Sequence, residues 1–325
     1  MPLAGHGGMR FAFPPYGFRC MENVISGKPA GEPLVYLNYT QAELDAAYDQ
    51  SAYQPNIQQL RDRWISNSER TRQRIGPPLR RPYGPAEIEQ LDIFRTERGT
   101  DRAGAPIFVF IHGGAWRAGS AKTYAAPAEM FIRAGVHYVV PDFLWVQDAE
   151  GSLLPIADQV CRAIAWVYEN AASFGGDRDR LYIGGHSSGA HLAAIALTTD
   201  WRREFGLPSD IIKGGMCSSG IYDLAPVRLS HRSSYVKFTD EMVAALSPQR
   251  HLDKLCAPLI VAYGTYETPE FQRQARDFAA AVRAAGKPVE LLVGEHYSHL
   301  ELPETLCSPH GLLGAAVLEQ MGLAE

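Results

Sequence analysis

The chain has 325 residues and a formal net charge of -5, with 46% hydrophobic and 21% charged residues. This length allows one large α/β domain with a substantial core, or two small domains. The charge gives no reason to expect nucleic acid or an anionic membrane as a partner, and no apolar run is long enough to span a bilayer. Because the first residues lack the basic and apolar regions of a secretory signal, we expect a cytoplasmic protein or an already processed form.

The first part of the chain differs in composition from the rest. Residues 1–37 are rich in Gly, Pro and aromatic side chains, which we interpret as an ordered arm on the core, with a lid or a homodimer contact as the alternative. A capping-box pattern at 40–43 predicts a helix there. An arginine-rich helix is expected at 58–74, with its basic face solvated. We assign 1–82 to this arm and helical extension and 83–325 to a catalytic domain.

The rest of the chain alternates short apolar segments with segments of helical periodicity. This alternation predicts an α/β fold with a doubly wound, mostly parallel sheet and helices on both faces. Sites in such folds lie beyond the carboxyl ends of the strands. Strands are expected at 88–94, 106–112, 137–143, 181–183, 214–224, 258–264 and 288–294, and helices at 125–134, 154–173, 190–197, 269–285 and 309–321.

A G-x-S-x-G pattern centred on Ser187 stands between an apolar strand and an alanine-rich helix. In that context the pattern predicts a sharp turn that presents the serine hydroxyl at the head of the sheet. Gly185 and Gly189 fit because strand and helix leave little room for side chains there. Ser187 is therefore the candidate nucleophile, and the Ser188 N–H, at the start of the helix, can help to hold an oxyanion. A plain Gly/Ser turn is the alternative.

A second glycine pair follows another predicted strand. Gly113 and Gly114 come directly after the segment 106–112, where hydrolases of this plan place further oxyanion donors. Glycine suits this position because nothing beyond Cα obstructs the approach of a substrate oxygen to the backbone N–H groups. We predict that both glycines contribute to an oxyanion hole.

A serine nucleophile needs a base, which the chain order Ser…acid…His places after the last strand. His299 lies in the loop after 288–294, and His296, three residues earlier, is its competitor. His186 and His191 flank the serine, but the turn directs them away from its hydroxyl. We expect these two to pack or to hydrogen-bond locally.

The acid that orients the base should follow the strand before the last one. Glu267 comes just after 258–264 and is the candidate, because a carboxylate there fixes the imidazole tautomer and stabilises the imidazolium. Asp223 follows the preceding strand and is the alternative. We expect Asp223 to cap a helix or to hold its loop.

Several segments together resemble the arylformamidase (kynurenine formamidase) family, over about residues 38–302. The resemblance implies the α/β-hydrolase fold, with Ser187 as nucleophile, Glu267 as acid, His299 as base and the two glycines at the oxyanion hole. The chain departs from the pattern in two places: Glu267 replaces the usual Asp, and Ser188 replaces a small alanine. The segments that carry the resemblance are YTQAELDAAY, HGGAWRAGS, GGHSSGAHLAA, DW, SGIYDLAPV and ETPEFQRQ.

We therefore expect a serine hydrolase that cleaves an aryl formamide or a carboxylic ester through an acyl-enzyme intermediate, with a small molecule as its partner. One alternative is a carboxylesterase acting on a bulky aromatic or xenobiotic ester. The other is a hydrolase-fold protein kept for binding. The histidines form no H-E-x-x-H motif, and the five cysteines no C-x-x-C pair. We accordingly expect no metal, no cofactor and free thiols.

A formamidase needs a cramped acyl side and an aromatic-lined side for the leaving group. Core packing is the alternative role for aromatic side chains near the end of a sheet. The candidate substrate-binding residues are His112, Trp116 and Trp145, and further aromatics that could line this pocket are Tyr16, Phe18 and Phe143.

Overall fold

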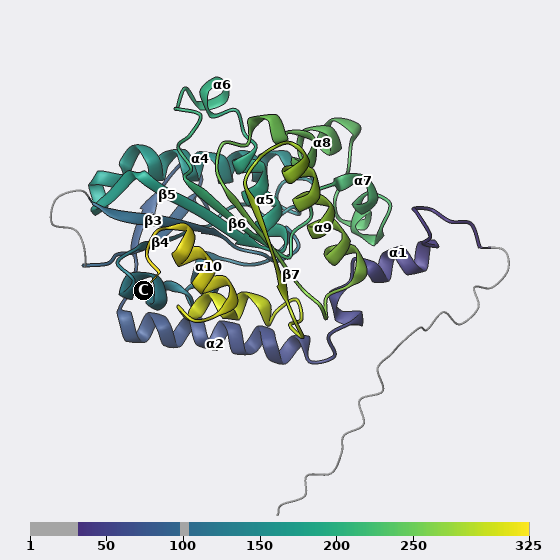
Figure 1. Cartoon of the computed structure of the whole chain (residues 1–325), viewed down its shortest axis with the longest axis horizontal. Coiled ribbons are helices and arrows are strands. Elements are labelled where there is room, and N and C mark those ends of the chain that lie inside the picture. Colours follow the sequence, from purple (N-terminus) through teal and green to yellow (C-terminus); the bar gives the residue numbers. More distant parts are fainter. Residues whose placement is uncertain (1–31, 98–103, 325) are drawn as a thin grey trace, which may run out of the picture.

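The computed structural model describes residues 32–97 and 104–324 and is built around one eight-stranded sheet (Figure 1). Its strand order is β1-β2-β4-β3-β5-β6-β7-β8. β2 pairs antiparallel with both of its neighbours, β1 and β4, and all the other pairs are parallel. The predicted α/β-hydrolase arrangement is thereby confirmed. The strands are β1 (Leu79–Pro82), β2 (Gln90–Phe94), β3 (Ala105–Ile111), β4 (His137–Pro141), β5 (Gly176–His186), β6 (Gly214–Ser218), β7 (Leu259–Gly264) and β8 (Val289–Gly294).

Helices cover both faces of the sheet, as the buried strands require. Figure 1 shows α4, α5 and α9 on one side, with α2 and α10 on the other. The helices are α1 (Gln41–Ala47), α2 (Ile57–Ile75), α3 (Ala128–Arg133), α4 (Leu154–Asn170), α5 (Ser188–Leu197), α6 (Trp201–Phe205), α7 (Leu224–Val227), α8 (Asp240–Ala245), α9 (Pro269–Ala284) and α10 (Leu312–Gln320). Among the described residues no helix is both long and apolar enough to cross a membrane.

The central strand β3 explains why the core has two layers. All seven of its residues are buried, and successive side chains point to opposite faces. Ile107 and Val109 belong to the apolar cluster beneath α4, α5 and α9, whereas Phe108 and Phe110 belong to the cluster beneath α3 and α10. An apolar run without alternation is what a strand covered on both faces needs.

The N-terminal segments pack onto this core. Thr40 and Glu43 form the predicted capping box of α1, and α1 contacts α9. We place the domain boundary between residues 82 and 83, so α1, α2 and the first strand of the sheet, β1, all precede it. The division into two parts stays a prediction. Most of the predicted arm, with Tyr16 and Phe18, lies outside the described residues.

Three segments differ from the predicted ones. The strand expected at 214–224 ends at Ser218, because Ser219 takes a left-handed backbone conformation with φ 55° and turns the chain away from the sheet. The strand expected at 181–183 is the centre of the much longer β5. The last helix begins at Leu312 rather than at 309, after a 3₁₀ segment at 302–307.

Candidate active site

Ser187 occupies a sharp turn between β5 and α5. Its backbone has φ 58° and ψ -125°, a region that non-glycine residues seldom adopt and that marks stored strain. The turn is this tight because a Cβ on Gly185 would lie 2.3 Å from the Gly189 carbonyl oxygen, and one on Gly189 would lie 2.1 Å from the Ile111 oxygen. The glycines predicted from the pattern are therefore sterically required.

The hydroxyl of Ser187 lies at the end of a chain of hydrogen bonds. His299 Nε2 is 2.9 Å from Ser187 Oγ, and His299 Nδ1 is 2.9 Å from Glu267 Oε2. His299 is 6% exposed and Glu267 1% exposed. The three residues follow β5, β7 and β8, whose carboxyl ends meet at one edge of the sheet. The structure thus brings together the serine, histidine and glutamate that the chain order singled out.

The second oxygen of Glu267 is also held. Oε1 accepts hydrogen bonds from Ser219 Oγ at 2.6 Å and from the Gly264 N–H at 2.7 Å. With both oxygens engaged, the carboxylate is fixed toward His299. The sequence pattern predicts no role for Ser219. The signal it carries is its position just after β6, in the strained backbone that ends the strand.

The two competing residues lie outside this chain of hydrogen bonds. His296 is exposed, and its ring nitrogen Nδ1 lies 3.0 Å from the Tyr266 hydroxyl. Asp223 caps α7, where its side chain accepts from the Ala225 N–H at 3.0 Å. The structure gives Asp223 the helix-capping position that we expected for it.

The glycine loop after β3 lies against the serine. A Cβ on Gly113 would be 3.3 Å from Ser187 Cβ, and one on Gly114, where φ is 126°, would be 2.1 Å from the Ala118 oxygen. Ser188 is the first residue of α5 and is 3% exposed. Because the first N–H groups of a helix have no intrahelical acceptor, its N–H stands at the positive end of α5. Backbone donors from two elements therefore adjoin Ser187.

The candidate substrate-binding side chains have unequal exposure. His112 is 1% exposed, stacks on Phe143 with ring centroids 4.1 Å apart, and has Nδ1 3.0 Å from the Gly113 oxygen. Trp116 is 2% exposed, and its Nε1 donates to His191 Nδ1 at 3.2 Å. Trp145 is 38% exposed, and its Nε1 donates to the Gly119 oxygen. His112 and Trp116 pack beneath the glycine loop. The role of His112, Trp116 and Trp145 in substrate binding stays a prediction.

The histidines beside Ser187 make distant rather than local contacts. His186 Nε2 donates to the backbone oxygen of His299 at 2.8 Å, and the two rings lie 4.6 Å apart. Burial, together with the neighbouring His299, holds the pKa of His186 well below its usual value. His191 Nε2 donates to the Leu246 oxygen, and burial lowers the pKa of His191 to about 4. Both rings are therefore neutral at neutral pH, and His186 braces the loop that carries His299.

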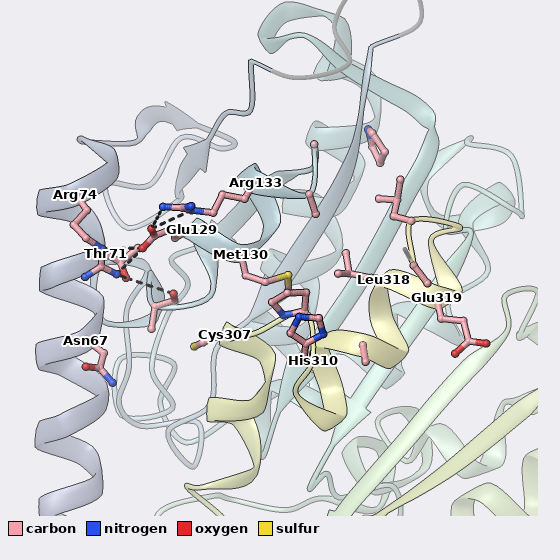
Figure 2. A pocket seen from close by; sticks show the side chains of 18 of the residues that line it. Asn67, Thr71, Arg74, Glu129, Met130, Arg133, Cys307, His310, Leu318 and Glu319 are labelled. Carbon is pink, nitrogen blue, oxygen red and sulfur yellow. Dashed lines mark hydrogen bonds and ion pairs between the residues drawn. The ribbon is translucent and has the colours of Figure 1, made fainter.

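A depression lies on the surface away from Ser187 (Figure 2). It has a volume of about 1220 Å³ and is lined by residues of α2, α3 and α10, none of which belongs to the Ser187 site. Ion pairs from Arg74 and Arg133 to Glu129 line one side of it. Within the described chain no group of three or more His, Cys, Asp or Glu side chains could hold a metal ion.

The chain is similar in sequence to known hydrolases. The BD-FAE family matches residues 91–219. Kynurenine formamidase of Danio rerio is 30% identical over 262 residues, which cover 79% of this chain and 86% of that protein. Esterase LipQ of Mycobacterium tuberculosis is 31% identical over 261 residues, covering 75% of this chain and 59% of that esterase.

Two solved structures have the same fold. A putative thioesterase from a Silicibacter species superposes with a TM-score of 0.72 at 24% identity, covering 84% of this chain and 98% of that one. A thermophilic esterase from Thermogutta terrifontis superposes with a TM-score of 0.63 at 20% identity, covering 77% and 94%. At these identities the likeness concerns the fold.

Proposed function

Because the chain belongs to the kynurenine formamidase family of α/β-hydrolases, we propose that it hydrolyses an aryl formamide of the N-formyl-kynurenine type with Ser187, His299 and Glu267 as its catalytic triad. The chain is an enzyme of the serine-hydrolase type, since its relatives are named formamidases and esterases. The observation that carries the proposal is the hydrogen-bonded chain Ser187–His299–Glu267, with 2.9 Å at both steps.

In the first half of the reaction, Ser187 Oγ attacks the formyl carbon while its proton passes to His299 Nε2. Glu267 holds the Nδ1–H of His299 and stabilises the imidazolium that forms. The carbonyl oxygen becomes an oxyanion, and we assign its stabilisation to the N–H groups of Gly113, Gly114 and Ser188. His299 then gives the proton to the leaving arylamine nitrogen, the C–N bond breaks, and Ser187 carries the formyl group as an ester.

In the second half, water takes the place of the amine. His299 removes a proton from the water as its oxygen attacks the formyl ester, and the same oxyanion donors act again. When the tetrahedral intermediate collapses, His299 returns a proton to Ser187 Oγ, and formate leaves. The enzyme is restored without any group beyond the triad and the backbone donors.

A carboxylesterase acting on a bulky aromatic ester is the second candidate. The similarity to esterase LipQ favours it, although this chain spans 59% of that esterase. The triad chemistry is the same for both substrates, because an alkoxide leaving group accepts the proton that an amine would take. What separates the two functions is the shape of the substrate pocket.

The experiment that separates them compares kcat/KM on N-formyl-L-kynurenine with kcat/KM on p-nitrophenyl esters of one- to eight-carbon acids. Under the proposed function, the formamide is turned over efficiently and activity on the esters falls steeply as the acyl chain grows. Rapid cleavage of long-chain esters with a negligible rate on the formamide would instead establish the esterase.

Replacing the nucleophile tests the triad itself. We expect Ser187→Ala to lower kcat about 10⁴-fold or more, because the covalent route is lost and only oxyanion stabilisation and substrate binding remain. The control is Ser173→Ala, an exposed serine in the 3₁₀ segment after α4, with unchanged kcat. Both variants should keep the wild-type melting curve. A serine-directed phosphonate should label the wild type and Ser173→Ala at Ser187; a Ser187→Ala variant with near wild-type kcat would remove Ser187 from the mechanism.

A further inference from the structure

Arg232 is a buried cation whose contacts are all neutral. It lies in the 3₁₀ segment His231–Ser234 and is 7% exposed. Its Nη1 donates to the Tyr235 hydroxyl at 3.0 Å and its Nη2 to the Tyr48 backbone oxygen at 2.9 Å, while Nε has no partner. Buried arginines normally pair with a carboxylate, since an uncompensated buried charge is costly. In the described part of the chain, no carboxylate lies within ion-pair distance of Arg232.

The rings of Trp116 and Phe271 lie between this guanidinium and the proposed catalytic groups. Its Cζ is 5.5 Å from the ring centroid of Trp116 and 5.9 Å from that of Phe271. Trp116 belongs to the glycine loop that lies against Ser187, and the Phe271 ring packs edge-on against His299 with centroids 5.0 Å apart. Arg232 therefore belongs to the surroundings of the site and is held there by two rings.

A second cation adjoins the first. Arg117, exposed in the glycine loop, lies with its Cζ 4.7 Å from the ring centroid of Tyr235, the tyrosine whose hydroxyl accepts from Arg232. Arg117 likewise has no ion pair among the residues that the structure describes. The nearby Asp49 instead accepts from the backbone and hydroxyl of Ser51, at 2.9 and 2.6 Å. Two guanidinium groups thus contact one tyrosine, and neither forms an ion pair with a carboxylate of the described residues.

We propose that Arg232, assisted by Arg117, binds a carboxylate of the substrate. The preferred substrates are then acyl arylamines or aryl esters that carry a free acid beyond the ring. Because the Arg232 guanidinium is fixed between two rings, its unused N–H donors stay in one plane. This planar arrangement binds a carboxylate better than it binds a neutral group. The buried rings of Trp116 and Phe271 hold the guanidinium in place from two sides. This inference rests on the proposed function, whose substrate type contains both an aromatic ring and an amino-acid carboxylate.

The first test uses the wild-type enzyme and needs no variant. N-formyl-L-kynurenine is compared with N-formyl-kynuramine, which is the same formamide without the carboxylate. We expect kcat/KM to be about 30-fold or more higher for the acid, because the neutral substrate leaves the buried cation unpaired. Values within about threefold of each other would overturn the inference.

The second test assigns the preference to a residue through the ratio of the two kcat/KM values. Arg232→Gln should lower this ratio about tenfold or more, and Arg232→Lys should lower it less, because lysine keeps the charge but loses the planar arrangement of donors. Since Arg232 also holds the Tyr48 carbonyl, melting curves must show that the variants fold. Arg117→Gln, at an exposed position, should fold normally and lower the ratio about threefold. An unchanged ratio in the folded variants would overturn the assignment.

A third test separates failure of this inference from failure of the proposed function. Hydrolysis of p-nitrophenyl acetate, a neutral ester, is inhibited with 4-phenylbutyrate or with 4-phenylbutanamide. If N-formyl-kynurenine is not a substrate, but the acid inhibits about tenfold better than the amide and Arg117→Gln reduces that difference, carboxylate binding stands and the formamidase proposal falls. If the acid has no advantage as substrate or inhibitor, carboxylate binding falls, whatever the formamidase rate.

Discussion

At the scale of single residues, the proposed acid Glu267 stands where the family pattern has the shorter Asp. Its Oε2 faces His299, while Oε1 accepts from Ser219 and from the Gly264 N–H. The extra methylene is thus accommodated by a side chain fixed at both oxygens. Asp223, the other acid considered, is used to cap α7 and is partly exposed.

This difference predicts how the two acids respond to removal of their charge. We expect Glu267→Gln to lower kcat about 10³- to 10⁴-fold, because an amide cannot hold His299 in the productive tautomer or stabilise its imidazolium. The matched variant Asp223→Asn should change kcat less than about threefold, since asparagine also caps helices. Steady-state kinetics of both variants, with circular dichroism to check folding, measures the difference. The opposite ranking would move the acid to Asp223.

The residues of the hydrogen-bonded chain could be predicted because each follows a strand in a fixed order along the chain. Ser187, Glu267 and His299 carry reactive groups, so residue type and position together single them out. Ser219 and Arg232 could not be found in this way. Ser219 matters through its contact with Glu267, 48 positions away, and Arg232 because no carboxylate of the described residues pairs with it. Neither property can be read from local sequence.

At the scale of elements, the turn from β5 to α5 depends on close contact between α5 and the end of β3. A Cβ added to Gly189 would lie 2.1 Å from the Ile111 carbonyl oxygen and 2.5 Å from the His112 carbonyl oxygen. A side chain there must push α5 away from the sheet and so displace Ser187. The position of Ser187 is therefore set by the packing of two elements.

We expect Gly189→Ala to lower the free energy of unfolding by about 3 kcal/mol, as overpacking of a close contact does, and to lower kcat in the folded fraction. The control is Gly206→Ala at the end of α6. An added Cβ there meets open space, but φ is 67°, which costs about 1 kcal/mol. Urea unfolding of both variants measures the difference. Equal losses would mean that α5 does not need this close approach.

Hydrophobic periodicity and turn residues predict some helices and strands better than others. Fully apolar strands such as β3 were predictable because burial on both faces leaves a continuous apolar run. The end of β6 was not predictable, because no residue type in SGIY indicates that Ser219 takes a left-handed backbone conformation. The edge strand β1 was also missed. Its sequence LRRP is half charged, which suits an edge but hides the strand pattern.

At the scale of the whole molecule, three histidines are buried where the glycine loop, β5 and α5 meet. Burial lowers the pKa of His112, His186 and His191 below the usual value, in His186 with a contribution from His299. Each ring is therefore neutral in the folded protein at a pH where the unfolded chain begins to bind protons. The same packing that fixes the site makes the fold sensitive to acid.

This predicts that the free energy of unfolding falls as the pH drops from about 6.5 towards 4. The folded pKa lies below the unfolded one, so the unfolded state binds more protons in this window, and stability is full only above the unfolded pKa. For His191, a pKa of about 4 in the folded state against 6.5 in the unfolded state corresponds to a stability contribution of roughly 3 kcal/mol.

Urea unfolding between pH 7.5 and 5, where most carboxylates stay charged, should show this decline in the free energy of unfolding. His191→Gln should reduce the slope, because glutamine can accept from Trp116 without titrating. His310→Gln, at an exposed position, should keep it, and equal slopes in wild type and His191→Gln would exclude His191 as a source of the acid sensitivity.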